Sequence, residues 1–327
     1  MVSPRTLSTM ASTMRKARLA ASALLAGLLA AGCGGGDAVT GNAIDPAIQA
    51  AFDSSQAGWR RERAEMLTKP GGWASLVGLH WIGPGPHYVG SSAGNGVRVA
   101  VGPSHLGMVD VRDGGIRFVP ERGVSLTLDG EPLDGAVMLS TDADGAAPSV
   151  LGFDDGRGRL SVIRRGTRRA LRVWHEDAAT RTGFKAIEYW PGGADWVLTG
   201  RYTPHAEPRT MEVTDIVGTI EQVANPGMIE FDRDGRTHRI EVLDPGREGA
   251  AIAFVDGTSG HGSYGIGRYL DVDLPATAGP VRLDFNRAYN PQCAFSKFST
   301  CRLTPNANRL DLRVEAGEKA YVAPSTP

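Results

Sequence analysis

The chain has 327 residues, with 35 basic and 36 acidic side chains and a formal net charge of −1. This balance argues against nucleic acid as a partner, because binding to a phosphate backbone needs an excess of basic residues. No Cys-x-x-Cys pair occurs and no two histidines have the helical zinc spacing, so the sequence predicts no metal and no cofactor.

The first 32 residues have the pattern of a lipoprotein signal peptide. They carry four basic residues and no acidic one, and the apolar run ALLAGLLAAG ends directly before Cys33. The run is too short to span a bilayer, and small residues precede the cysteine as they do at a cleavage site. We expect a lipid on Cys33, a flexible tether over residues 33–44, and an exported protein anchored to the membrane, the outer one if the cell has two. An ordinary secretory signal is the alternative.

Removing this leader takes four of the 35 basic residues away and leaves 36 acidic ones, a net charge of −5. Residues 45–82 are expected to hold an N-terminal helix and an apolar segment. Asp45 suits the N-cap, Pro46 suits the first helical position, and Lys69-Pro70-Gly71-Gly72 ends the helix. Apolar residues recur along it at spacings of four and seven: Ile48, Phe52, Trp59 and Met66.

The rest of the chain has the pattern of β-structure. Alternating apolar runs are separated by Asp-Gly pairs, which favour tight hairpins. The 43 glycines are about twice the usual share, which fits many turns. We therefore predict a mainly β fold, with an N-terminal helix followed by two β-sandwich-like or barrel-like units over 83–148 and 149–322. The expected strands include 96–101, 115–120, 124–130, 169–174, 228–243 and 309–314. The first unit, a small sandwich containing GSSAGNGVRVAVGPSHLG, is loosely similar in shape to forkhead-associated domains.

The densest polar segment is DFNRAYNPQCAFSKFSTCRLTPNANRL, residues 284–310. Its two cysteines, Cys293 and Cys301, are eight residues apart, and cysteine pairs of exported proteins are usually oxidised. We predict a disulfide between them. The alternative is a reactive thiolate, for which Lys297 or Arg302 could supply the stabilising positive charge.

This segment and the loop 256–269 are expected to be neighbours and to form a ligand site. The loop contains a G-x-G-x-x-G string at 260–265, but no helical pattern follows it, so it does not predict dinucleotide binding. His80 is added because it lies beside Trp81 in an apolar stretch, where a polar ring needs a partner. The candidate ligand-binding residues are His80, His261, Tyr264, Arg268, Asp284, Asn286, Tyr289 and Asn290.

Three functions are compatible with these loops. The leading hypothesis is a lipid-anchored protein that binds a polar ligand, either sugar-like or anionic. The second is an envelope hydrolase that uses Asp256, Asp284 or Glu318 as a general base. The third is a purely structural envelope protein, in which the polar loop is a plug pinned by the disulfide. The sequence assigns no catalytic residue and leaves open whether the protein is an enzyme.

Five strings carry a resemblance to a known family: GGWASLVGLHWI (71–82), VDGTSGHGSYGIGRYL (255–270), DFNRAYNPQCAF (284–295), TCRLTPNANRL (300–310) and EAGEK (315–319). Over about residues 50–322 the chain resembles domain-of-unknown-function family 1684, whose members are often exported or lipid-anchored. The family pattern has prolines where this chain has Gln292 and Thr304, which affects loop stiffness more than chemistry. The resemblance implies a shared β fold and marks the polar loops as the family signature, but it implies no reaction.

Overall fold

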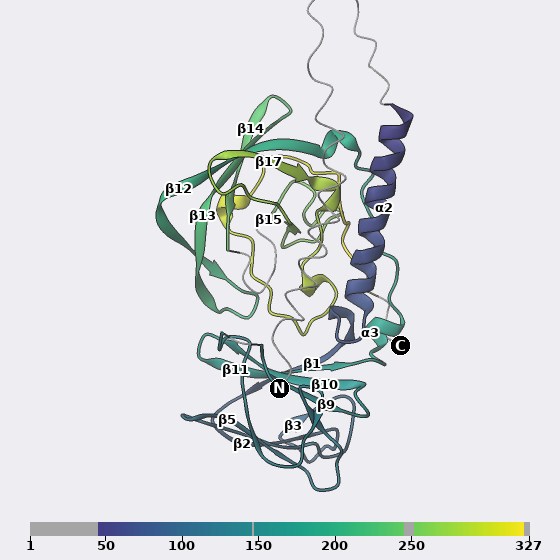
Figure 1. Cartoon of the computed structure of the whole chain (residues 1–327), viewed down its shortest axis with the longest axis vertical. Helices are drawn as coiled ribbons and strands as arrows, with labels where there is room; N and C mark the ends of the chain where they lie inside the picture. The colour runs from purple at the N-terminus through teal and green to yellow at the C-terminus, as the bar shows by residue number, and fades with distance from the viewer. Residues whose placement is uncertain (1–44, 146, 245–251, 324–327) are drawn as a thin grey trace, which may run out of the picture. The chain divides into compact units, whose positions relative to one another are not determined.

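The structure, a computed structural model, describes residues 45–145, 147–244 and 252–323 (Figure 1). The expected signal peptide, the tether and Cys33 lie outside these ranges. The protein is mainly β, with an N-terminal helix followed by several β-sheets, as the sequence predicts.

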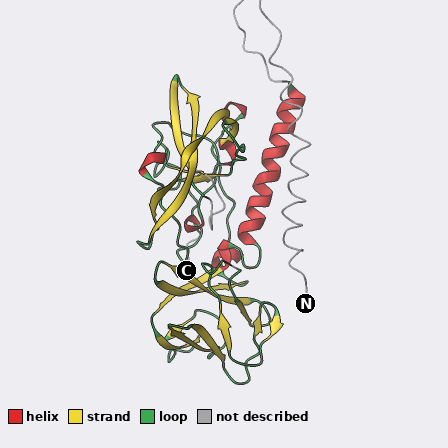
Figure 2. Ribbon diagram, turned by 60° about the vertical axis from the view of Figure 1, so that its left-hand side comes forward, coloured by secondary structure: helices red, strands yellow, loops and turns green. Residues whose placement is uncertain are grey.

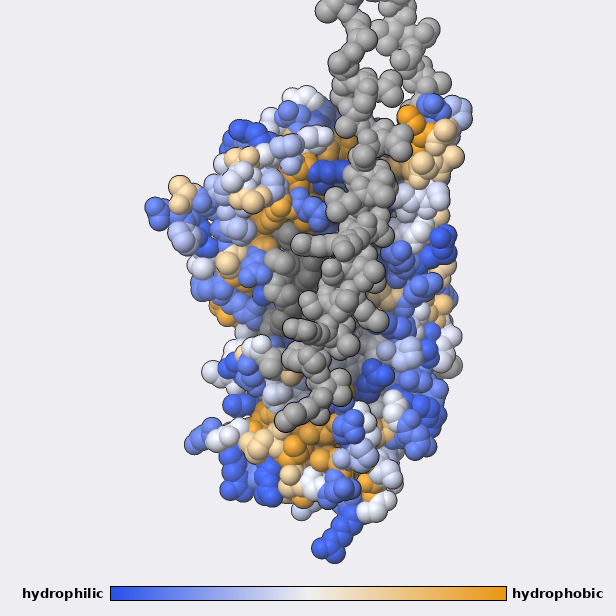
Figure 3. Space-filling view, in the orientation of Figure 1, coloured by the Kyte–Doolittle hydropathy of each residue, from blue (hydrophilic) through white to orange (hydrophobic). Residues whose placement is uncertain are grey.

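Helix α2 (Pro46–Thr68) begins and ends where the sequence predicts. Three residues of the predicted apolar stripe, Ile48, Phe52 and Trp59, are half-buried, and the fourth, Met66, is 50% exposed. The fully buried residues lie beside that stripe and are Gln56, Arg63 and Leu67. Two of these three side chains are polar because α2 packs against polar loops of the C-terminal sheet region, beside which it runs in Figures 1 and 2. No helix within the described ranges is long and apolar enough to cross a membrane. Hydrophilic residues dominate the edge of Figure 3 where α2 lies.

The first β part contains two sheets. The six-stranded sheet has the order β1-β11-β10-β9-β6-β7, and the five-stranded sheet has the order β3-β2-β4-β5-β8. All neighbouring strands are antiparallel except β2 and β3. The strands are β1 (Leu76–Ile82), β2 (Gly85–Gly90), β3 (Val97–Arg98), β4 (Gly107–Arg112), β5 (Gly115–Pro120), β6 (Thr127–Leu128), β7 (Glu131–Pro132), β8 (Val137–Leu139), β9 (Val150–Phe153), β10 (Gly158–Arg165) and β11 (Arg168–His175).

One apolar core joins these two sheets. Val109 and Phe118 come from the five-stranded sheet, and Leu160 and Leu171 come from the six-stranded sheet. The core therefore includes residues on both sides of position 148, where the sequence analysis divides the two units. Burial of alternate side chains on each strand leaves the opposite face of the six-stranded sheet available for other contacts.

The second β part contains a four-stranded antiparallel sheet, β14-β13-β12-β17, and a two-stranded sheet, β15-β16. Phe231, Phe254 and Phe285 lie at the centre of its apolar core. The strands are β12 (Val197–Thr214), β13 (Ile220–Arg233), β14 (Arg236–Val242), β15 (Ile252–Phe254), β16 (Arg268–Leu270) and β17 (Gly279–Asp284). The short helical segments are η1 (Trp73–Ser75) between α2 and β1, and α3 (Ala179–Thr182) and η2 (Ala194–Trp196) between β11 and β12. Three more follow β17: η3 (Phe285–Arg287), η4 (Gln292–Ala294) and η5 (Asn306–Asn308).

Asp-Gly pairs form the predicted two-residue turns at three hairpins: β4–β5, β6–β7 and β13–β14. Asp234 and Gly235 have φ angles of 52° and 72° between β13 and β14, as a tight two-residue hairpin requires. The prediction of a strand at 309–314 is wrong. That segment is held by the Asp256 carboxylate, which accepts from the Val314 N–H at 2.8 Å, and by a single bridge to Val255.

Candidate functional site

The two polar loops are neighbours, as expected. β17 ends at Asp284, and the chain then turns through η3 and returns to pair with the end of the other loop. Tyr289 and Tyr269 exchange two backbone hydrogen bonds, at 2.7 and 2.9 Å. The chain therefore leaves the strand at Asp284 and turns through η3 before it reaches Pro291.

Arg268 is fully buried at the centre of this region. Its guanidinium donates to the carbonyl oxygens of Ala316 and Val314 and, at 3.2 Å, to the Asp256 carboxylate. Burial lowers the pKa of Arg268, and the Asp256 charge opposes that shift. Asp256 also accepts hydrogen bonds from Thr258. These contacts hold the C-terminal segment against β16.

Asp284 and Asn286 make a second buried group. Asn286 exchanges two 2.8 Å hydrogen bonds with the backbone of Gly193 and donates to Asp284 at 3.0 Å. The other Asp284 oxygen accepts from Gln56 of α2 at 3.0 Å. A Cβ added at Gly192 would lie 2.2 Å from the Asn286 amide oxygen, so glycine is needed for this close approach.

Asn290 and Tyr289 contribute to a third group, around Glu318. Glu318 is fully buried and accepts from Arg63 of α2 at 2.9 Å and from the Asn290 N–H at 2.7 Å. The Arg63 guanidinium lies 4.5 Å from the centre of the Tyr289 ring. Burial raises the pKa of the Tyr289 hydroxyl, which donates to Asp271 at 2.9 Å.

The three other candidates lie apart from these groups. His80 is on β1, where burial lowers its pKa, and no described residue bonds to its Nε2. His261 is exposed, and Tyr264 is half-buried with a pKa raised by burial. The eight candidates therefore do not converge, and none of them lines either cavity described below. Their ligand-binding role stays a prediction.

The proposed general bases are engaged by other groups of the protein. Asp256, Asp284 and Glu318 are each at most 5% exposed and each accept hydrogen bonds from protein donors. A general base needs a lone pair that can reach a substrate or a water molecule. The described contacts of these carboxylates are thus those of structural anchors.

A cavity of about 190 Å³ lies at the disulfide, where the outer face of the six-stranded sheet meets the loop 292–301. Strand alternation explains its chemistry. On β10, Leu160 and Val162 face the apolar core, so Arg165 faces the other side; on β11, Arg172 lies between two core residues. The lining residues are Trp73, Asp142, Arg165, Arg172, Gln292, Ser299, Thr300 and Cys301.

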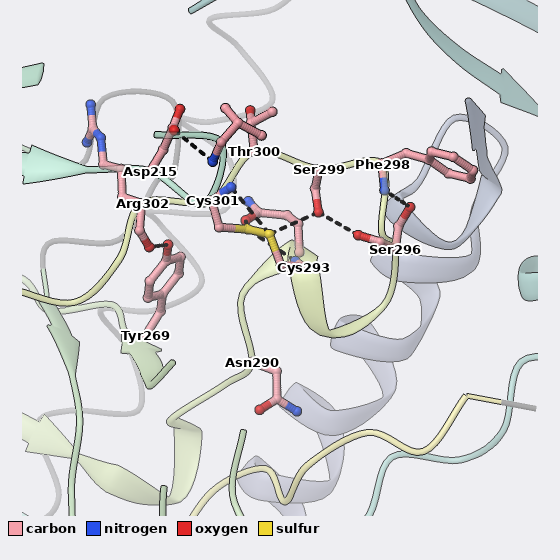
Figure 4. Close-up of a disulfide and its surroundings, with 12 residues drawn as sticks. Asp215, Tyr269, Asn290, Cys293, Ser296, Phe298, Ser299, Thr300, Cys301 and Arg302 are labelled. Carbon is pink, nitrogen blue, oxygen red and sulfur yellow. Dashed lines mark hydrogen bonds between the residues drawn. A yellow bond between two sulfur atoms is a disulfide. The ribbon is translucent and has the colours of Figure 1, made fainter. Parts of the chain in front are cut away.

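Thr300 is the centre of this cavity's hydrogen bonding. Its Oγ1 accepts from Arg165 Nε at 2.7 Å and from Arg172 Nη2 at 3.3 Å. These two bonds use both lone pairs of the hydroxyl oxygen. The hydroxyl can therefore make one further hydrogen bond, in which it donates its hydrogen. Among the described residues, none accepts that hydrogen. Figure 4 shows Thr300 between Ser299 and Cys301, beside the disulfide.

Arg165 has one donor group left over as well. Only 4% of the residue is exposed, its Nη1 donates to Asp142 at 2.7 Å and to the Arg164 carbonyl, and its Nε donates to Thr300. Within the described ranges no protein group accepts from its Nη2. Because Arg165 and Thr300 both line the cavity, the Thr300 hydroxyl and the Arg165 Nη2 are two donors that suit a bound oxyanion.

Sequence reasoning missed Arg165, Arg172, Asp142 and Trp73. The sequence does contain a pattern that points to two of them: in the segments that form β10 and β11, arginine occurs next to apolar core residues and so on the opposite face of the strand. It was not used because an arginine on a strand usually faces solvent. The disulfide between Cys293 and Cys301 is present, as predicted.

A second, shallower depression of about 790 Å³ lies on the four-stranded sheet. Its charged groups are already paired: Glu230 accepts from Arg201 at 2.6 Å and from Arg239 at 2.8 Å. These two arginines lower the pKa of Glu230. The lining of this depression has two arginines and two carboxylates, whereas the cavity at Thr300 has two arginines and one carboxylate, Asp142, which pairs with Arg165. The cavity at Thr300 therefore keeps the larger excess of positive charge for a ligand.

Comparison with known proteins agrees with the resemblance seen in the sequence. A family described as "Protein of unknown function (DUF1684)" matches residues 182–319. The chain is also similar to a solution NMR structure of an uncharacterized protein of Haloarcula marismortui, at 28% identity. That match covers 42% of this chain and 78% of the other, with a TM-score of 0.35. No curated protein matches.

Proposed function

We propose that this protein, whose residues 182–319 match the DUF1684 family, is a lipid-anchored cell-envelope protein that binds a small anionic ligand at Thr300. The observation that carries the proposal is the Thr300 hydroxyl, whose lone pairs are both used by arginines and whose hydrogen has no acceptor among the described residues. A buried donor without an acceptor costs free energy, and an oxyanion in the cavity removes that cost.

The chemistry of the cavity selects the ligand class. Arg165 offers its Nη2 and Thr300 its hydroxyl, and both are donors, so the bound atom must be an acceptor. A guanidinium prefers a negatively charged oxygen over a neutral one. We therefore assign the cavity to a carboxylate or phosphate group rather than to a neutral sugar.

The size of the cavity limits what enters it. Sites for drug-sized ligands usually have volumes of about 300–1,000 Å³, whereas this cavity has about 190 Å³. It accommodates the charged head of a ligand, with the remainder of a larger molecule outside. The lipobox before Cys33 supports the anchored location.

Anion binding can be measured on the detergent-solubilised protein by calorimetry and by thermal stabilisation, with orthophosphate, sulfate and acetate as separate ligands. We expect at least one of the three to bind. Thr300→Val keeps the shape of the side chain but removes the hydroxyl, which is both the donor to the anion and the acceptor from Arg165 and Arg172. Loss of the hydrogen bond to a charged group alone costs about 1.5–3 kcal/mol, or about 10- to 100-fold in affinity. Thr300→Ser should restore binding.

Arg164 provides a matched control for Arg165. Its side chain is 41% exposed, and it does not line the cavity. Arg165→Gln should therefore weaken binding, whereas Arg164→Gln should leave it unchanged. Equal affinity of the wild type and Thr300→Val for all three anions would refute the proposal. Preference for phosphate over acetate, or the reverse, identifies the chemical group.

A further inference from the structure

The disulfide forms part of the wall of the proposed anion cavity. Four of the lining residues, Gln292, Ser299, Thr300 and Cys301, lie in or next to the loop that the disulfide closes. Thr300, which carries the unused hydroxyl donor, is the residue directly before Cys301 (Figure 4). The position of the donor therefore depends on the bond between the two sulfur atoms.

The two cysteines differ in how easily a reductant can reach them. Cys301 is 1% exposed, whereas Cys293 is only partly buried. A thiolate from solution therefore attacks Cys293, and Cys301 becomes the leaving group. Both sulfurs accept hydrogen bonds: Cys301 from the Cys293 N–H, and Cys293 from the Cys301 N–H and the Ser299 hydroxyl. Of the two cysteines, Cys301 alone lines the cavity of Arg165 and Arg172, so positive charge stabilises its thiolate as the leaving group.

We infer that the Cys293–Cys301 disulfide is a thiol–disulfide exchange site that regulates anion binding, an inference that rests on the proposed function. Reduction puts a negative charge on Cys301 at the cavity wall, where it competes with the anion for the same arginines. It also releases the loop that positions the Thr300 hydroxyl. The oxidised protein binds the anion and the reduced protein releases it.

The exchange balances with a dithiol as the reductant. One thiolate of the dithiol bonds to the Cys293 sulfur, and the electron pair of the broken S–S bond goes to Cys301. The second thiolate then attacks the reductant's own sulfur in the mixed disulfide, which releases Cys293 and leaves the dithiol oxidised. Two electrons pass to the protein, and protons from the dithiol are distributed between solvent and the new thiols.

The coupling is reciprocal: if the oxidised protein binds the anion more tightly than the reduced protein does, bound anion must stabilise the oxidised protein. An anion held between the arginines and Thr300 removes part of the positive charge that stabilises the leaving thiolate. It also holds the loop closed. Bound anion should therefore slow reduction of the disulfide, just as reduction weakens the anion's binding.

The test uses sulfate, whose charge is constant above neutral pH, and dithiothreitol, on the Cys33→Ser protein so that only Cys293 and Cys301 react. Sulfate affinity is measured before reduction, after reduction with thiol counting and circular dichroism, and after reoxidation. We expect affinity to fall at least tenfold on reduction and to return on reoxidation. Saturating sulfate should slow reduction at least fivefold, and this protection should be absent in Thr300→Val.

Two further variants separate charge on Cys301 from loss of the fold. Cys293→Ala leaves Cys301 as a free thiol, so sulfate binding should weaken at least fivefold between pH 7 and pH 9.5. Cys293→Ala combined with Cys301→Ala has no thiol to ionise and should show no such loss. The same pH profile in both variants would overturn the inference.

The outcomes also distinguish this inference from the proposed function. If the oxidised wild type binds sulfate, orthophosphate and acetate no more tightly than Thr300→Val does, both the proposed function and the redox inference are refuted. Tight binding to the oxidised protein with unchanged affinity after complete reduction would refute the redox inference alone and leave the anion site standing.

Discussion

Two buried arginines show how side chains of the same type differ in their roles. Both terminal nitrogens of Arg268 donate to the protein itself, to two carbonyl oxygens and the Asp256 carboxylate. Arg165 keeps its Nη2 for the cavity that it lines. At the residue scale, neither burial nor an unpaired donor identifies a site by itself, because the Nε of Arg268 also has no partner among the described residues. Arg165 differs from Arg268 in lining a cavity that a ligand can enter.

His80 makes the stability depend on pH. Burial holds the pKa of His80 below its usual value, so the ring binds a proton more weakly in the folded protein than in the unfolded chain. Above the unfolded pKa of about 6.5 the ring is neutral in both states. As the pH falls below that value, the unfolded chain binds more protons and the free energy of unfolding decreases.

Thermal melts at pH 7.5 and pH 5.5 test this prediction. His80→Phe removes the titrating ring, so the melting temperature of the variant should fall less between the two pH values than that of the wild type. His261→Phe is the control, since His261 is exposed, and it should follow the wild type. If the melting temperature of His80→Phe falls as much between pH 7.5 and pH 5.5 as that of the wild type, His80 is not the source of the acid sensitivity.

At the scale of elements, polar contacts attach α2 to the loops of the second β part. Arg63 pairs with Glu318, and Gln56 donates to Asp284, seven positions earlier on the same helix face. Both carboxylates are buried, at 0% and 5% exposure. A helix with these side chains at these positions fits a polar cleft and would be poorly placed over an apolar core.

Removing one partner of this buried pair should be costly. Arg63→Met leaves the Glu318 carboxylate buried without its cation, and we expect the free energy of unfolding in urea to fall by about 3–5 kcal/mol. Adding Glu318→Gln to Arg63→Met should recover part of that loss, because the buried charge is then gone.

Arg61 is the matched control on the same helix. It is exposed, so Arg61→Met should change stability by less than about 0.5 kcal/mol. A loss for Arg63→Met no larger than that for Arg61→Met would show that the ion pair does not hold the helix in place.

At the scale of the whole molecule, attachment to the membrane is predicted to depend on Cys33. Cells supplied with a palmitate analogue should label the protein, and Cys33→Ser should abolish the label and release the protein from the membrane fraction. Cys33 follows small residues and precedes Gly34, so no aspartate retention signal stands there. Continued labelling of Cys33→Ser would disprove the lipobox assignment.

The elements of this protein were largely predictable from local patterns. The N-cap and proline at the start of α2, the Asp-Gly hairpins and the alternation of the strands each depend on residues a few positions apart. The disulfide was predictable because its two cysteines are only eight residues apart in the chain. The strand expected at 309–314 failed because its backbone pairs with Val255 and Gly257 over only a few residues, and the Asp256 carboxylate then takes the Val314 N–H.

The cavity could only be found in the tertiary structure. Arg165 and Thr300 are 135 residues apart, and neither has a local pattern that points to the other. The same holds for Arg63 and Glu318, which are 255 residues apart. Short-range periodicity states which face of a strand or helix is apolar, but the partner of a polar side chain on the other face is set by how the sheets and loops pack. Local patterns were enough for a mainly β protein with a helix and a disulfide, and they predict a lipobox at Cys33. Packing of distant segments places the carboxylates of the polar loops in internal hydrogen bonds and brings Arg165 and Thr300 together beside the disulfide.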